Sequence, residues 1–161
     1  MTKYLLAAYA CIGDAVPMVG DCGRLCGSAC CRPGQDDRGM LLFPGEEKLL
    51  SGQPGFRINE GLLRCEGICA REFRPLACRI FPLTPFLKKG DGLSLRMDIR
   101  GAGMCPLVRG GTAALHPEFL RGVSAALALL YARPEYRPFL EEWMEAESSL
   151  RLLRKRMKRR G

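Results

Sequence analysis

Residues 21–31 read Asp-Cys-Gly-Arg-Leu-Cys-Gly-Ser-Ala-Cys-Cys, and this stretch begins the pattern on which the fold depends. The pattern contains eight of the nine cysteines in the 161-residue chain: Cys22, Cys26, Cys30, Cys31, Cys65, Cys69, Cys78 and Cys105. Thiols clustered in this way in a short chain indicate either a disulfide framework or a metal site. The choice between the two decides how the rest of the chain is interpreted.

The N-terminus lacks the features of a secretory signal peptide. A single Lys3 precedes a short apolar run, and Asp14 follows where a cleavage region is normally small and neutral. Nine cysteines are an odd number, which a closed disulfide framework would not leave. No stretch approaches the roughly 18 consecutive apolar residues of a membrane span. We therefore expect a cytoplasmic protein without a transmembrane segment, whose reduced thiols bind metal.

The fold expected from these features is α+β. Residues 1–110 hold most of the 19 Gly and 11 Pro, and long periodic apolar runs are few there. We expect this part to be a small, irregular, metal-stabilised Cys-rich domain with short strands, because metal binding can supply folding free energy that burial does not. Residues 111–161 are expected to form a helical pair with a basic tail, packed with the first part as one unit.

Several short elements are expected between the cysteines. Residues 40–43 form an apolar, strand-like run, and residues 44–52 are typical of a short helix in which Glu46 and Glu47 are first-turn acids. Residues 56–58 and 62–64 indicate a hairpin, and residues 93–99 alternate as a half-buried strand does.

The last third of the chain is expected to be helical. A helix beginning at Pro117 would carry one apolar face: Phe119, Val123, Leu127 and Leu130. After Arg133-Pro134, apolar residues recur every seven positions in two series: Tyr136, Trp143, Leu150 and Met157, then Phe139, Ala146 and Leu153. This repeat fits an amphipathic helix packed on its own domain, or the seam of a coiled-coil dimer.

Positive charge is concentrated in the tail. The formal net charge is +8, and it would be +1 without seven basic residues that have no acid between them: Arg151, Arg154, Lys155, Arg156, Lys158, Arg159 and Arg160. Such a tail could bind a protein partner, RNA, DNA or an acidic membrane surface. It could equally be a solvated helix end, where cations are favoured.

The cysteine spacing predicts how the thiols group. Cys22, Cys26 and Cys30 are four residues apart, which on a helix places neighbouring Cβ atoms about 5–6 Å apart on one face. Cys31 cannot share that face, so the chain turns there or Cys31 serves a different site. Eight thiolates divide into four and four, the complement of tetrahedral zinc or of an iron–sulfur cluster. The spacing leaves the choice between these two cofactors open.

Six arginines lie beside the cysteines in sequence and could donate hydrogen bonds to sulfur: Arg24, Arg32, Arg64, Arg71, Arg74 and Arg79. Cys11, the ninth cysteine, is interpreted as a small core residue. His116 is the only histidine, and a capping or surface role at the start of a helix is its default. One histidine does not allow a Ser-His-Asp or Cys-His arrangement to be assembled, so no catalytic residue is predicted.

The cysteine string, followed by Arg74-Pro75-x-x-Cys78-Arg79-x-Phe81-Pro82, resembles the YkgJ family of cysteine-cluster proteins, described as having a zinc- or iron-chelating domain. The resemblance extends from about Asp21 to Pro106 and implies metal chelation through the eight cysteines. It implies no particular reaction. A related cysteine-rich region occurs in the larger flagellin lysine methylases, but this chain has no glycine-rich nucleotide fingerprint to support methyl transfer.

Three functional hypotheses follow. The first is a metal-binding protein that holds zinc or an iron–sulfur cluster for a structural role, metal handling or electron transfer. The second is an iron–sulfur-dependent enzyme or accessory protein in redox or methyl-transfer chemistry. The third is an interaction module in which metal stabilises the fold and the basic C-terminal helix contacts a partner.

Overall fold

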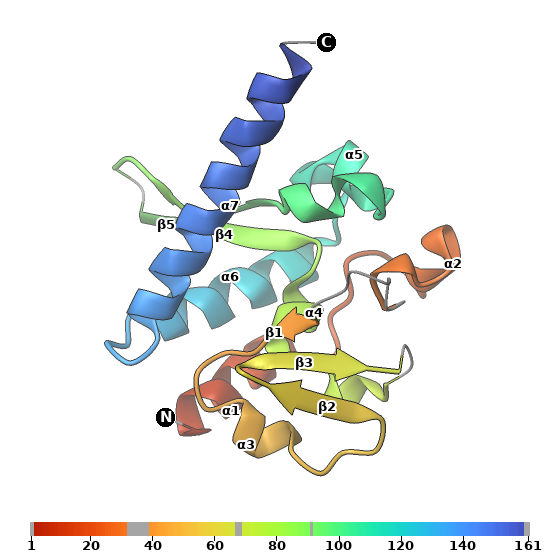
Figure 1. The fold of residues 1–161 in the computed structure, drawn as a ribbon, viewed down its shortest axis with the longest axis vertical. Helices are drawn as coiled ribbons and strands as arrows, with labels where there is room; N and C mark the ends of the chain where they lie inside the picture. The colour runs from red at the N-terminus through yellow and green to blue at the C-terminus, as the bar shows by residue number, and fades with distance from the viewer. Residues whose placement is uncertain (1, 32–38, 67–68, 91, 160–161) are drawn as a thin grey trace.

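The computed structural model describes residues 2–31, 39–66, 69–90 and 92–159. Long helices lie near the two ends of the chain, and short strands lie between them (Figure 1). The long helices are α1 (Thr2–Ile12), α6 (Pro117–Tyr131) and α7 (Arg137–Lys158). The expected α+β class with C-terminal helices is confirmed.

The strands form two small antiparallel sheets. In the first, β1 (Met40–Leu41) and β2 (Phe56–Asn59) flank β3 (Leu62–Cys65), with Ile58 opposite Leu63. The β2–β3 hairpin was predicted, and it turns through Glu60 and Gly61, whose φ angles are 48° and 74°. Positive φ at both central residues is what a tight hairpin turn requires.

The second sheet is a hairpin of β4 (Leu83–Lys88) and β5 (Gly92–Met97). Strand β5 was expected, whereas β4 was not, because Pro82 and Pro85 interrupt that part of the sequence. Pro85 lies opposite Leu95 in this two-stranded sheet. It is tolerated because β4 has only one neighbouring strand in the sheet, so the missing N–H of Pro85 leaves no carbonyl of a second strand without a donor.

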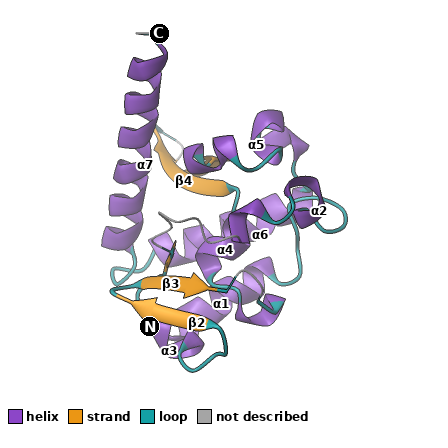
Figure 2. Cartoon of the chain, turned by 45° about the vertical axis from the view of Figure 1, so that its right-hand side comes forward, coloured by secondary structure: helices purple, strands orange, loops and turns teal. Residues whose placement is uncertain are grey.

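Short helical turns connect these elements: α2 (Gly23–Cys26), η1 (Ala29–Cys31), α3 (Glu47–Leu50), η2 (Arg71–Phe73), α4 (Leu76–Ile80), η3 (Ile99–Gly103), α5 (Leu107–Gly110) and η4 (Thr112–Ala114). Helix α2 stands at the edge of the molecule, on the opposite side from α7 (Figure 2). The expected helix within residues 44–52 is confirmed as α3.

The main hydrophobic core joins the two ends of the chain. Its buried residues come from α1, α4, β4, α6 and α7, and from loops between them. The predicted face of α6 is confirmed: Phe119, Val123, Leu127 and Leu130 are all buried. Helix α1 packs against α6 so closely that a Cβ at Gly122 would lie 2.7 Å from the carbonyl oxygen of Cys11. Only glycine fits at this crossing.

Helix α7 is packed on the body for only part of its length. Leu140, Trp143 and Met144 are buried, and Trp143 forms an edge-on aromatic contact with Phe43, their centroids 5.7 Å apart. Further along the heptad series, Leu150 and Met157 are 44% and 74% exposed. The first half is therefore an amphipathic helix packed on its own domain, and the second half extends past β4 and α5 (Figure 1).

A smaller cluster of Leu42, Leu50 and Leu63 lies beneath the first sheet, with Cys65 packed against it. None of the helices in the described part of the chain is both long and apolar enough to cross a membrane.

Candidate metal centre

The first cysteine segment does not form the continuous helix that its spacing predicted. Helix α2 ends at Cys26, because Gly27 adopts a left-handed C-cap with φ 58° and Ser28 follows with φ 56°. The chain therefore turns between Cys26 and Cys30, not at the Cys30–Cys31 junction. Expecting Cys22, Cys26 and Cys30 on one helical face was wrong, because α2 is only one turn long.

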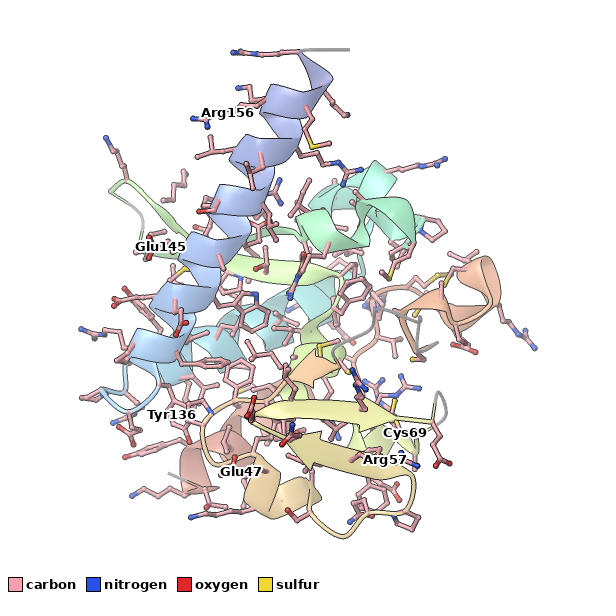
Figure 3. The ribbon with its side chains drawn as sticks, viewed as in Figure 1. Glu47, Arg57, Cys69, Tyr136, Glu145 and Arg156 are labelled. Atoms are coloured by element: carbon pink, nitrogen blue, oxygen red, sulfur yellow. The ribbon has the colours of Figure 1, made fainter. Side chains whose placement is uncertain are left out.

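The remaining cysteines come from four other places in the fold. Cys65 ends β3, Cys69 precedes η2, Cys78 lies in α4, and Cys105 lies between η3 and α5. Figure 3 places Cys69 near the Cys65 end of the first sheet. Seven of the eight cysteines are half-buried and Cys30 is exposed, and all are free thiols.

One group of thiols forms around Cys22. Burial raises the pKa of the Cys22 thiol, and the charges of Asp21, Cys105 and Cys26 raise it further. Cys30 belongs to the same neighbourhood, since the charges of Cys26 and Cys22 act on it. Cys22, Cys26, Cys30 and Cys105 are thus electrostatic neighbours, although Cys105 is distant in sequence.

A second group forms around Cys78. Burial raises the pKa of Cys78, and the charges of Cys31, Cys69 and Cys65 raise it further. Cys69 in turn is affected by Cys65 and Cys31. Cys31 is thus an electrostatic neighbour of the second group as well as of Cys30.

The two groups meet at the Cys30–Cys31 pair. Their Sγ atoms lie 3.9 Å apart. A hydrogen bond from Cys30 lowers the pKa of Cys31 to about 6; burial opposes this shift, and the charge of Arg74 assists it. The pKa of Cys30 is raised by the same hydrogen bond, then by burial.

Arg74 is the cation shared by these thiols. It donates a hydrogen bond to Cys69, and its charge also acts on Cys31 and Cys78. Its Nε atom is buried and has no hydrogen-bond partner in the described part of the chain. A metal-bound thiolate could accept a hydrogen bond from this buried donor. In its hydrogen-bond donors, the site therefore fits a metal held by thiolates.

We expected all six arginines to donate hydrogen bonds to sulfur, but Arg71 and Arg79 donate to backbone carbonyls instead. Arg71 Nη2 donates to the carbonyls of Ala15 and Gly13, at 2.6 and 3.4 Å. Arg79 donates to the carbonyls of Arg74, Arg71, Glu72 and Gly13, and stacks over Tyr9. These two arginines hold the loop that carries Arg74. Arg24 and Arg64 are exposed, and Arg32 lies outside the described residues.

Glu46 is a residue that sequence reasoning missed. Glu46 is fully buried and lies at the N-cap of α3. Of the two predicted first-turn acids, only Glu47 lies in the first turn of this helix. The Glu46 carboxylate accepts hydrogen bonds from the Tyr9 hydroxyl, from Phe43 N at 2.8 Å and from Leu76 N at 2.5 Å. It thereby ties α1 and the segment after β1 to α4, the helix that carries Cys78.

Burial raises the pKa of Glu46, while the hydrogen bonds from Tyr9, Leu76 and Phe43 lower it in part. Burial and the charge of Glu46 also raise the pKa of Tyr9 far above its usual range. Nothing in the local sequence distinguishes Glu46 from Glu47, because the N–H donor of Leu76 comes from a helix 30 residues away.

The thiols are neighbours without being gathered around one point. Within the described ranges, no three Cys, His, Asp or Glu side chains lie close enough together to hold a single ion. Thiols are nevertheless the donors that zinc and iron–sulfur clusters prefer.

Cys11 and His116 lie apart from both groups. Cys11 is exposed, so its assignment to the core was wrong: α1 buries the face of Leu5, Ala8 and Ile12, and Cys11 lies off that face. His116 occupies the N-cap position of α6, but its side chain makes no capping hydrogen bond. Both residues line an open hollow of about 490 Å³ beside Asp14, Met18 and Glu118, among others.

The chain matches no protein-family model, no curated protein and no solved structure. Membership of the YkgJ family therefore stays a prediction that depends on the cysteine pattern and the Arg74–Pro82 motif.

Proposed function

We propose that the chain is a metal-binding protein that holds zinc or an iron–sulfur cluster through eight cysteines. The observation that supports this most directly is spatial. Eight thiols from five separate segments are electrostatic neighbours, and the guanidinium of Arg74 lies among them. Cysteines that only fill a hydrophobic core are normally buried at separate positions, without a cation shared among them.

The neighbourhoods support two sites of four thiolates each. The first would consist of Cys22, Cys26, Cys30 and Cys105, and the second of Cys31, Cys65, Cys69 and Cys78. Each set combines cysteines that are close together in the sequence with cysteines from elsewhere in the chain, as structural metal sites commonly do. Four thiolates on Zn²⁺ carry a net charge of about −2, and Arg74 would offset part of that charge.

The donor set suits both cofactors, and the two differ in the chemistry that they would supply. Zinc would stabilise the fold without redox chemistry, whereas an iron–sulfur cluster would add electron transfer. In either case the chain's own residues hold the thiolates in place: Glu46 anchors the helix of Cys78, and Arg79 anchors the loop of Arg74.

The decisive experiment is metal and acid-labile sulfide analysis, with a visible absorption spectrum, on protein purified without air. Colourless protein with two zinc ions per chain, or brown protein with iron and sulfide, would support the proposal and identify the cofactor. Folded protein that retains no metal after purification without chelators would refute it.

Single substitutions then test the division into two sites. Cys26→Ser and Cys69→Ser should each remove about half of the bound metal, because each removes one ligand from a different set of four. Cys11→Ser is the matched control, since Cys11 is an exposed thiol outside both sets. Equal metal loss in the Cys11 variant would contradict the assignment of ligands.

A further inference from the structure

The C-terminal half of α7 presents an apolar stripe that the body of the protein does not cover. Ala146, Leu150, Leu153 and Met157 are spaced four, three and four residues apart, which keeps them on one side of a helix. All four are exposed, Leu150, Leu153 and Met157 by 44%, 55% and 74%. The stripe extends for about 16 Å along the helix axis.

The stripe is exposed because a different line of residues faces the body. Leu140, Trp143, Met144 and Glu147 are the buried residues of α7. On the same side, Arg151 donates to the Met97 carbonyl and Arg154 Nη1 donates to the Ile99 carbonyl at 3.2 Å. These contacts fix the rotation of the helix and leave the apolar stripe on its flank.

Cations are concentrated in the same half of α7. Between Ser148 and Arg159 the chain has six basic residues and no acidic one. All of these except Arg151 are exposed, and Arg154 also donates to the Ile99 carbonyl. Figure 3 shows Arg156 near the projecting end of α7, with Glu145 farther back along the same helix. The helix dipole accounts for cations in the last turn only, and it does not account for exposed apolar side chains.

We propose that this half of α7 binds an anionic phospholipid surface, with Leu150, Leu153 and Met157 entering the interface and the flanking cations contacting lipid headgroups. An amphipathic basic helix of this composition gains from apolar burial and from charge together. Each Lys or Arg near an anionic leaflet strengthens binding by about fivefold. The long stem of Arg156 allows its charge to reach the headgroups from beside the stripe.

Two other occupants explain the surface less well. A second copy of the helix would cover little more than a stripe of four side chains, far less than the about 800 Å² per partner of a standard interface, and would bring like charges together. A nucleic acid would account for the cations but not for the stripe, and residues 148–159 contain no aromatic side chain for base stacking.

The test is co-sedimentation of the full chain with vesicles. Binding is expected on phosphatidylcholine vesicles that contain about 30% phosphatidylserine, at least tenfold more tightly than on phosphatidylcholine alone, and it should weaken as salt rises. The triple variant Leu150→Ser/Leu153→Ser/Met157→Ser should bind at least tenfold more weakly, although its charge is unchanged. Lys155→Glu/Arg156→Glu should reduce binding by a similar factor or more.

Matched controls separate the surface from general effects. Leu6→Ser removes an apolar side chain that is 55% exposed on α1, like Leu153, and should leave binding unchanged. Arg57→Glu/Arg121→Glu reverses two exposed charges elsewhere and should cost far less than the change on α7. Thermal unfolding of every variant verifies that the fold is intact, which exposed positions should permit.

Three outcomes would overturn the proposal. The first is no binding to anionic vesicles at about 0.1 M salt, where the Debye length is about 10 Å. The second is binding that charge reversal abolishes and the serine variant retains, which would assign the helix end to a polyanion such as nucleic acid. The third is a wild-type dimer in light scattering that the serine variant converts to monomer.

Discussion

Arg74 is the side chain on which the charge balance of the cysteine groups depends. It is the arginine whose charge acts on thiols of both groups, and its buried Nε is a donor still open to sulfur. Sequence position alone did not separate it from the five other arginines near cysteines. The separation required knowing that Arg71 and Arg79 donate to backbone carbonyls, which is a property of the folded loop.

Replacing Arg74 should therefore weaken metal binding without removing a ligand. We expect Arg74→Met to lower metal affinity by about 10–100-fold, the usual effect of losing a hydrogen bond to a ligand. Competition with a chromophoric chelator measures it. Arg64→Met is the control, because Arg64 adjoins Cys65 in sequence but its side chain is exposed. Equal affinity in the two variants would show that the cation has no part in the site.

The buried carboxyl group of Glu46 predicts a pH dependence of stability. Burial raises its pKa, so the folded chain binds more protons than the unfolded chain at pH values above about 4.5, the ordinary carboxyl pKa. The free energy of unfolding should fall as pH rises through that window, by at most about 1.4 kcal/mol per pH unit from this group. Its stabilising contribution is lost above the raised pKa.

Glu46→Gln should remove this slope, because an amide does not titrate. It should also cost about 1–3 kcal/mol, since one amide oxygen cannot satisfy three buried donors as a carboxyl group does. Urea unfolding between pH 4.5 and 7 measures both effects. Glu47→Gln, at the first turn of α3, should keep the wild-type slope. A slope that persists in Glu46→Gln would assign it to another carboxyl group.

Among the elements, α7 is held on the body by buried polar contacts as well as by apolar packing. Glu147 is 1% exposed and pairs with Arg96 of β5 and with Arg151 Nε, the latter at 2.6 Å. It also accepts from Ile99 N at 3.3 Å. We expect Glu147→Ala to lower the free energy of unfolding by about 3 kcal/mol, at the low end for breaking a buried pair, because both arginines are partly exposed.

Chemical denaturation measures this change, and Glu145→Ala is its control. Glu145 is exposed on the same helix, so its replacement should change stability by less than about 0.5 kcal/mol. Similar losses in both variants would mean that the cost reflects the overall charge of α7 and not the buried pair.

At the scale of elements, periodic patterns were the reliable part of the sequence. The face of α6 and the β2–β3 hairpin follow from apolar spacing and from a Glu-Gly turn, which are local properties. The course of α2 did not follow from cysteine spacing, because the helix stops where Gly27 and Ser28 adopt positive φ. Strand β4 was missed because Pro82 and Pro85 interrupt its sequence, and its pairing with β5 is not a local property.

For the whole molecule, the division between the two hydrophobic clusters predicts the effect of metal removal. The main core of α1, α4, α6 and α7 contains no cysteine of the eight among its buried residues, whereas Cys65 packs against the small cluster under the first sheet. Chelation under reducing conditions should therefore loosen residues 21–31 and 56–66 and leave α1 and α6 folded.

Hydrogen exchange followed by mass spectrometry distinguishes these regions. Protection should fall in the two cysteine-bearing segments and persist in α6. Equal loss of protection in α6 would mean that the metal is required for the whole fold.

The candidate ligands could be predicted from the sequence because the clustering of thiols is a local pattern. Their division into two groups could not, because it depends on how the fold brings Cys105 and Cys78 close to residues 22–31.

The packing of α1 against α6 also sets an order of events during synthesis of the chain. Gly122 meets the backbone of Cys11 and Ile12, so α1 cannot be buried until α6 has been made. At about 5–20 residues per second, translation reaches Tyr131 roughly 6–24 s after Ile12. Cys105 precedes Pro117, the first residue of α6. A chain made in this order presents all eight thiols to surrounding metal ions and oxidants before its helical core can close.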